Sequence, residues 1–83
     1  MKAKEMFEKE GSYKMQKSHY INGITYIKTL DKEYEEISFL INYEDSLNKE
    51  NERTLICLKN IENLEEEVIY AISQQLKEVK EDK

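Results

Sequence analysis

The sequence predicts an α+β fold, an antiparallel sheet of three or four strands with a short N-terminal helix and a long C-terminal helix packed on one face. Apolar residues recur with a helical period near both ends of the chain and alternate with a strand period between them. In addition, Asn22-Gly23 separates two strand-like runs. The expected order of elements is α-β-β-β-β-α.

The first predicted helix, "AKEMFEKEG" at residues 3–11, is very short. Isolated helices of fewer than about 12 residues are marginal in water, so this one must be held by the rest of the chain. We expect Met6 and Phe7 to dock on the sheet. Gly11 is expected to end the helix, because glycine tolerates the positive φ common just past a last turn.

The strand region begins at "SYKMQKSHY", where Tyr13 and Met15 alternate with polar residues. Asn22-Gly23 then predicts a type I′ hairpin turn of two residues, and "LDKEY" at 30–34 predicts a second reversal. A third strand with one buried face follows from four alternating apolar residues, Ile37, Phe39, Ile41 and Tyr43. Residues 44–53 are expected to form a polar loop and residues 54–59 a short fourth strand.

The last predicted element is a helix from Asn63 to about Lys80. Its apolar stripe is formed by residues three and four apart, Leu64, Val68, Ile72, Gln75, Leu76 and Val79, and is widened by Ile69 and Ala71. Asn63 followed three residues later by Glu66 predicts a capping box.

Length and composition predict one small domain over residues 1–83, with the last few residues frayed. A chain of this size buries only roughly 60% of its unfolded surface. The single cysteine, Cys57, cannot form an internal disulfide, so the core depends on packing and a reducing cytoplasm fits best. We find no secretory signal and no run of about 20 apolar residues, and therefore expect a soluble protein that does not contact membranes.

Two motifs at the ends of the chain resemble a known family. "AKEMFE" at Ala3–Glu8, and Ala71, Ile72 and Gln75 in "AISQQLKEV", are similar to helices of small uncharacterised proteins encoded by phages and prophages of low-GC Gram-positive bacteria. The usual Leu-Gly-Tyr after the first helix is Glu10-Gly11-Ser12-Tyr13 here. The resemblance implies an origin and no activity, since the family has none known.

Charge argues against direct binding to nucleic acid. The net charge is −5, acidic residues are interleaved with lysines, and Arg53 is the single arginine. Binding to a phosphate backbone requires clustered positive charge. An acidic inhibitor that occupies the nucleic-acid site of a host protein remains an alternative.

No residue set predicts catalysis, a cofactor or a metal. His19 has no second ligand at metal-site spacing, and a metal site needs three or four converging ligands. Cys57 lies between Ile56 and Leu58 and is expected to be a small buried hydrophobe. With two glycines, the chain has no phosphate loop. We therefore expect a protein that is not an enzyme and uses no cofactor.

The sequence does predict a partner surface, because two helices cover only one face of a sheet. If Ile37 and Phe39 face the helices, Leu40 points to the other side. It is joined there either by Ile24 and Tyr26 or by Thr25 and Ile27. We prefer Ile24 and Tyr26, since Lys28 shares their side and tolerates solvent.

The predicted occupant of that surface is a host or phage protein. Self-association as a structural homo-oligomer is the alternative that uses the same face. The surface would not exist if the loop at 44–53 folded over it, or if a curled sheet buried both of its sides. The six tyrosines are expected mainly at the core and its edge, with some in a contact surface.

Overall fold

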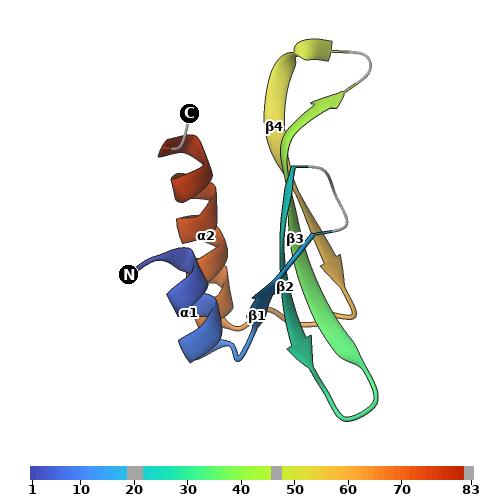
Figure 1. Cartoon of the computed structure of the whole chain (residues 1–83), viewed down its shortest axis with the longest axis vertical. Coiled ribbons are helices and arrows are strands. Elements are labelled where there is room, and N and C mark those ends of the chain that lie inside the picture. The colour runs from blue at the N-terminus through green and yellow to red at the C-terminus, as the bar shows by residue number, and fades with distance from the viewer. Residues whose placement is uncertain (19–21, 46–47, 82–83) are drawn as a thin grey trace.

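The computed structural model describes the backbone of residues 1–18, 22–45 and 48–81. The side chains of these residues are described as well, except at positions 42–53. Figure 1 shows two helices and four strands, in the predicted order. They are α1 (Ala3–Glu10), β1 (Lys14–Gln16), β2 (Gly23–Thr29), β3 (Tyr34–Asp45), β4 (Asn48–Lys59) and α2 (Glu66–Glu81). The α+β prediction is confirmed.

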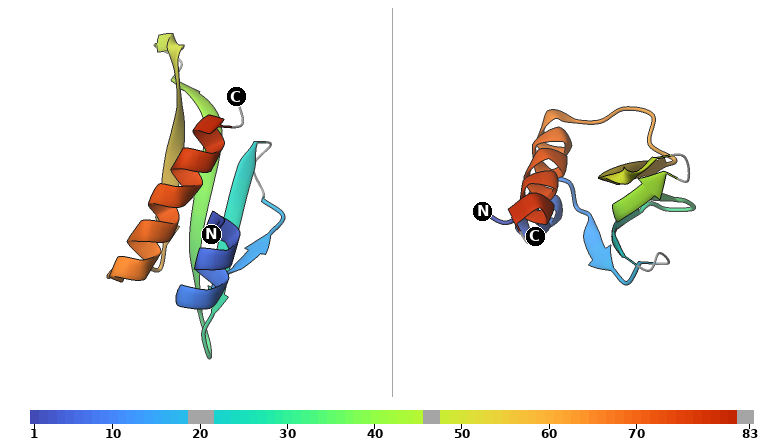
Figure 2. Two further views of the ribbon diagram at one scale, coloured as in Figure 1. Left: turned by 90° about the vertical axis from the view of Figure 1, so that its left-hand side faces the viewer. Right: turned by 90° about the horizontal axis from the view of Figure 1, so that it is seen from above.

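The four strands form one antiparallel sheet in the order β1-β2-β3-β4. Residues 54–59 therefore do pair as part of a fourth strand. The second predicted reversal is also confirmed, since the Leu30 N–H donates to the Glu33 carbonyl at 2.8 Å between β2 and β3. Both helices lie on the same side of the sheet, with α1 towards β1 and α2 towards β4 (Figure 2).

The polar loop predicted at residues 44–53 is wrong. β3 continues to Asp45 and β4 begins at Asn48, with Tyr43 opposite Arg53 in a ladder that contains two register irregularities. Backbone groups carry a hairpin ladder, so a polar composition does not end it. The two strands form an arm that extends past the rest of the sheet (Figure 1).

The two-residue turn predicted at Asn22-Gly23 is also wrong. β1 and β2 do pair, but Gln16 lies opposite Thr25, so the connection is six residues long. Gly23 is the first residue of β2, lies opposite Leu40 and has no positive φ. The Asn22 carbonyl accepts from the Ile41 N–H at 2.7 Å. The segment is thus held by β3, and core burial sets the register over local turn preference.

Gly11 ends α1 as predicted, but for a different reason. Its φ is −114°, and it is Ser12 that takes a positive φ of 59°. A Cβ at Gly11 would lie 2.8 Å from Cδ2 of Tyr13 and 3.2 Å from Cγ2 of Val68. Close approach of these side chains, and not a left-handed backbone, explains the glycine.

α2 begins later than predicted. Its first turn starts where the Glu65 carbonyl accepts from the Ile69 N–H, so Glu65 and not Asn63 is the capping position. The buried stripe is confirmed at Val68, Ala71, Gln75 and Val79. Ile69 was assigned to the stripe wrongly, because its side chain is 46% exposed.

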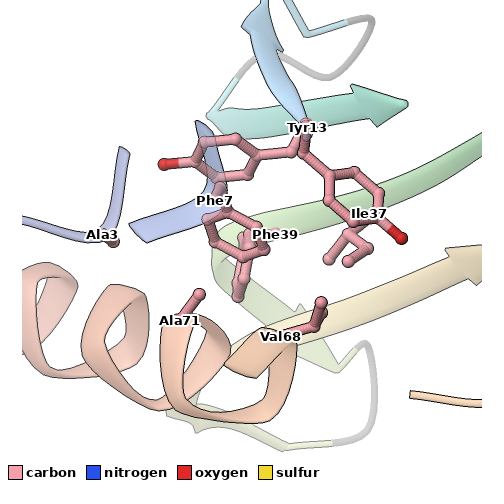
Figure 3. Close-up of a cluster of buried hydrophobic side chains, with 8 residues drawn as sticks. Ala3, Phe7, Tyr13, Ile37, Phe39, Val68 and Ala71 are labelled. Carbon is pink, nitrogen blue, oxygen red and sulfur yellow. The ribbon is translucent and has the colours of Figure 1, made fainter. Parts of the chain in front are cut away.

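Packing in the core explains how the short helix α1 is held in place. Phe7 is fully buried, stacks on Tyr26 at a centroid distance of 3.9 Å, and meets Tyr13 and Phe39 edge-on. Met6 packs against the same cluster, so the predicted docking of both residues is confirmed. Figure 3 shows Phe7 between the strands and Ala71 and Val68 of α2. Burying such a side chain contributes about 1.5 to 3 kcal/mol.

Candidate protein-binding surface

Strand pairing places the three predicted partner residues on two different faces. Ile24 lies opposite Phe39 and Tyr26 opposite Ile37, on the side that the helices cover. Tyr26 is fully buried under Phe7, and Ile24 packs against the core. The choice of Ile24 and Tyr26 as surface residues is therefore wrong, and only Leu40 lies on the far face.

The reason for that choice was the solvent tolerance of Lys28, and this was a poor indicator of which face is exposed. Lys28 does share a face with Tyr26, but its Nζ lies over the ring of Tyr13, 5.9 Å from the centroid, at the margin of the helix layer. Side-chain size was the better signal. Ile24 and Tyr26 offer more apolar area than Thr25 and Ile27, so the larger pair gains more from burial.

The face without helices, called the open face below, has a buried centre. Thr25 and Ser38 lie opposite each other there and share a hydrogen bond at 3.0 Å. Ser38 also contacts Oε2 of Glu36 at 3.3 Å. Both hydroxyl side chains are almost fully buried, and the described residues include no buried side-chain polar atom without a hydrogen bond. The centre of the open face is therefore small, and its polar groups are hydrogen-bonded.

Apolar side chains surround this centre. Leu40 lies in one row across the sheet with Gly23 and Leu55, while Ile27 lies on the other side of the centre. Leu40 and Ile27 are half-buried, and Leu55 is 37% exposed. Because Gly23 has no side chain, nothing from β2 shields Leu40 directly across the ladder.

A shallow depression continues the open face towards the turn between β2 and β3. Its volume is about 490 Å³, and its lining includes Ile27, Leu30, Tyr34 and Glu36. Tyr34 is fixed at this end, since its hydroxyl accepts from Nζ of Lys59 at 2.6 Å. The rim carries both signs of charge, with Asp31, Lys32 and Glu33 in the turn.

The arrangement offers no evident chemistry. Cys57 is a free, half-buried thiol opposite Ser38 on the open face, whereas it was expected to be buried. His19 lies outside the described residues. Among the residues whose side chains are described, 1–18, 22–41 and 54–81, no three His, Cys, Asp or Glu side chains gather as a metal site.

The tyrosines divide between core and surface. Burial, with smaller effects from Glu35 and Glu65, raises the pKa of Tyr13 to about 12. Burial likewise raises the pKa of Tyr26, with Glu78 and Glu8 adding to it. Tyr34 and Tyr70 are exposed, while Tyr20 and the side chain of Tyr43 lie outside the description. Tyr34 is the member of the described set that reaches the open face.

Across the described residues, none of the helices has the length and apolar character needed to cross a membrane. No family model, curated protein or solved structure matches the chain.

Proposed function

We propose that this protein is a non-enzymatic binding domain that holds another protein, from a host cell or a phage, against its open face. The observation that carries the proposal is the position of Leu40, an apolar side chain on the face that neither helix covers. On the open face apolar side chains surround a small buried pair of hydroxyls, and charged residues lie beyond them; apolar contact area bounded by polar groups is the usual make-up of a protein interface.

The surface suits apolar side chains of the partner. Two such groups fit, one on Leu40 and Leu55 and the other on Ile27 beside the depression at Tyr34, because Leu40 and Ile27 lie about 13 Å apart along the sheet. Lys14, Glu36 and Lys59 lie in one row of the same face and offer both signs of charge to polar groups around it. The acidic balance of the chain plays no part in this contact.

A phage or prophage origin is part of the proposal and rests on the resemblance of the two end motifs. Four of the residues that carry it, Ala3, Phe7, Ala71 and Gln75, are buried where α1 meets the sheet and α2. The motifs therefore mark how the helices pack, and the binding surface lies elsewhere. We propose a cytoplasmic location on the strength of the free thiol of Cys57.

The test is Leu40→Glu, with Met15→Glu as the matched control. Met15 is 41% exposed and lies on the helix side of the sheet, so it receives the same charge on the other face. Wild type and Met15→Glu should recover the same stoichiometric protein from host or phage-infected lysate, and Leu40→Glu should not.

Stability measurements distinguish loss of binding from loss of folding in these variants. Leu55→Glu alters the same face at a more exposed position and should also abolish recovery while unfolding at nearly the wild-type temperature. Recovery by both open-face variants would overturn the proposal. So would a melting temperature far below wild type for both variants, which would mean that the face is core.

A further inference from the structure

The two flanks of α2 are used differently. On one flank, Glu78 reaches α1, where its Oε2 accepts from the Ala3 N–H at 2.6 Å. The other flank carries Ile69, Ile72 and Leu76, spaced three and four residues apart, and Val79 continues the series. Ile69 is 46% exposed, and Ile72 and Leu76 are only half-buried. This flank, called the α2 seam, is apolar; Ile72 and Leu76 pack in part against the core, and no other helix of the described residues lies on this side.

The α2 seam lies on the same side of the molecule as the free edge of the sheet. β4 is an edge strand, and the left view of Figure 2 shows α2 crossing over it while α1 lies towards β1. On its helix-facing side β4 carries Leu58, 46% exposed, and Ile56, half-buried. Its run Leu55–Leu58 has no charge, whereas natural edge strands are usually protected by charges or proline.

We propose that the α2 seam and the edge of β4 together form the interface of a homodimer with a second copy of this chain. A two-fold axis normal to the sheet sets both α2 and β4 antiparallel to their counterparts. The helices then meet as a short antiparallel pair, with Ile72 against Leu76 of the second copy and Ile69 towards either end of the contact.

Charge complementarity selects a second copy as the occupant. Glu66 and Lys80 are fourteen positions apart, two heptads, and so lie along the same border of the α2 seam. In the antiparallel pair each Glu66 lies beside Lys80 of the other copy. The antiparallel arrangement also opposes the two helix dipoles. Glu66 is held at this border by a 2.8 Å hydrogen bond from the Tyr70 hydroxyl.

The available area sets the strength of the contact. A 16-residue helix is about 24 Å long, and the helix and sheet layers are each about 10 Å thick. The interface is then about 500 Å² per copy, or about 1,000 Å² in total, at the lower limit for a specific contact. We therefore expect reversible dimerisation at micromolar concentration.

Sedimentation equilibrium of the full chain tests the apolar part. Ile69→Glu should raise the dissociation constant about tenfold or more, because it buries a carboxylate in the α2 seam. Met15→Glu is the control, since Met15 is 41% exposed and lies in β1, at the opposite edge of the sheet from β4. It should dimerise nearly as wild type does. A wild type that stays monomeric at several hundred micromolar, or an Ile69→Glu variant that dimerises normally, would overturn the proposal.

A charge exchange tests the antiparallel pairing. Glu66→Lys and Lys80→Glu should each weaken self-association, because like charges then meet at both ends of the seam. An equimolar mixture of the two variants should form a heterodimer at least as tight as the wild-type dimer, since each copy then meets opposite charges. A mixture that stays monomeric would contradict this pairing. Leu40→Glu lies outside the interface, and loss of the dimer in that variant would show that the open face is used instead.

Discussion

At the residue scale, one buried hydrogen bond explains a polar residue in an apolar stripe. The Tyr26 hydroxyl donates to Oε1 of Gln75 at 2.5 Å, and both side chains are buried. Gln75 was predicted in the stripe of the last helix from its spacing alone. The reason for its polarity needed the structure, because its partner is 49 residues away in the sequence.

Removing one partner should therefore cost more than removing both. Tyr26→Phe leaves the Gln75 amide without its donor and should lower the free energy of unfolding by about 1 to 3 kcal/mol. Tyr26→Phe combined with Gln75→Leu should recover part of that loss. Urea unfolding of wild type and both variants measures it, and a double variant less stable than Tyr26→Phe would contradict the role given to this bond.

Burial of tyrosine also fixes how stability changes at high pH. The folded pKa of Tyr13, about 12, exceeds the usual value of 10.0 for a tyrosine, and the pKa of Tyr26 is raised in the same way. Above pH 10 the unfolded chain loses these protons while the folded chain retains them, so stability is lost as pH rises towards the folded pKa. Unfolding free energies from pH 8 to 11.5 should decline, less steeply in Tyr13→Phe. Equal slopes of unfolding free energy against pH in wild type and Tyr13→Phe would show that folding does not raise the pKa of Tyr13.

At the element scale, α1 depends on α2 for its first turn. Lys2 at its N-cap makes no side-chain hydrogen bond, and Glu78 supplies the acceptor for the Ala3 N–H instead. Gln74 Nε2 donates to the same Glu78 oxygen at 3.0 Å and orients it. A cap from a distant helix leaves no local signal, which is why the sequence predicted the helix and its docking but not its cap.

Glu78→Ala should fray α1 and destabilise the fold by about 0.5 to 2 kcal/mol, the range for losing an N-cap. Hydrogen exchange should speed up most at the first amides of α1. Glu78→Gln is the control, because its amide oxygen still accepts a hydrogen bond. Identical exchange in Glu78→Ala and wild type would show that the cap contributes nothing.

The end of α1 gives a second prediction at this scale. Gly11→Ala places a methyl group against Tyr13 and Val68, which are both buried and cannot move aside. We expect a loss of about 1 to 3 kcal/mol, as for other overpacked positions. At an unstrained site, exchanging glycine for alanine usually stabilises a protein. A thermal melt that rises in Gly11→Ala would contradict the close approach.

Element by element, periodic signals were reliable, whereas of the two turn signals in the strand region only the reversal at residues 30–34 was confirmed. α1, β3 and α2 were predicted because their apolar spacing reflects one buried face each. Asn22-Gly23 was misread because the ladder with β3 and the burial of Tyr26 outweigh a local turn preference. The arms of β3 and β4 were missed because backbone pairing continues where the sequence is polar.

At the scale of the whole molecule, the candidate site depends on which face of the sheet the helices cover. The sequence placed Leu40 on the far face, since that follows from alternation with Ile37 and Phe39. It did not fix the register of β2, so Ile24 and Tyr26 were put beside Leu40 when Thr25 and Ile27 lie there. That choice depends on the stacking of Phe7 on Tyr26, a contact between elements that local pattern does not encode.

The most direct test of this account measures solvent access to the open face in the dilute wild-type protein. In NMR spectra recorded with a soluble paramagnetic probe, the methyl signals of Leu40, Ile27 and Leu55 should broaden strongly, and that of Ile37, which is fully buried, should not. Protection of Leu40 equal to that of Ile37 would mean that the face is covered, and would contradict a binding surface there.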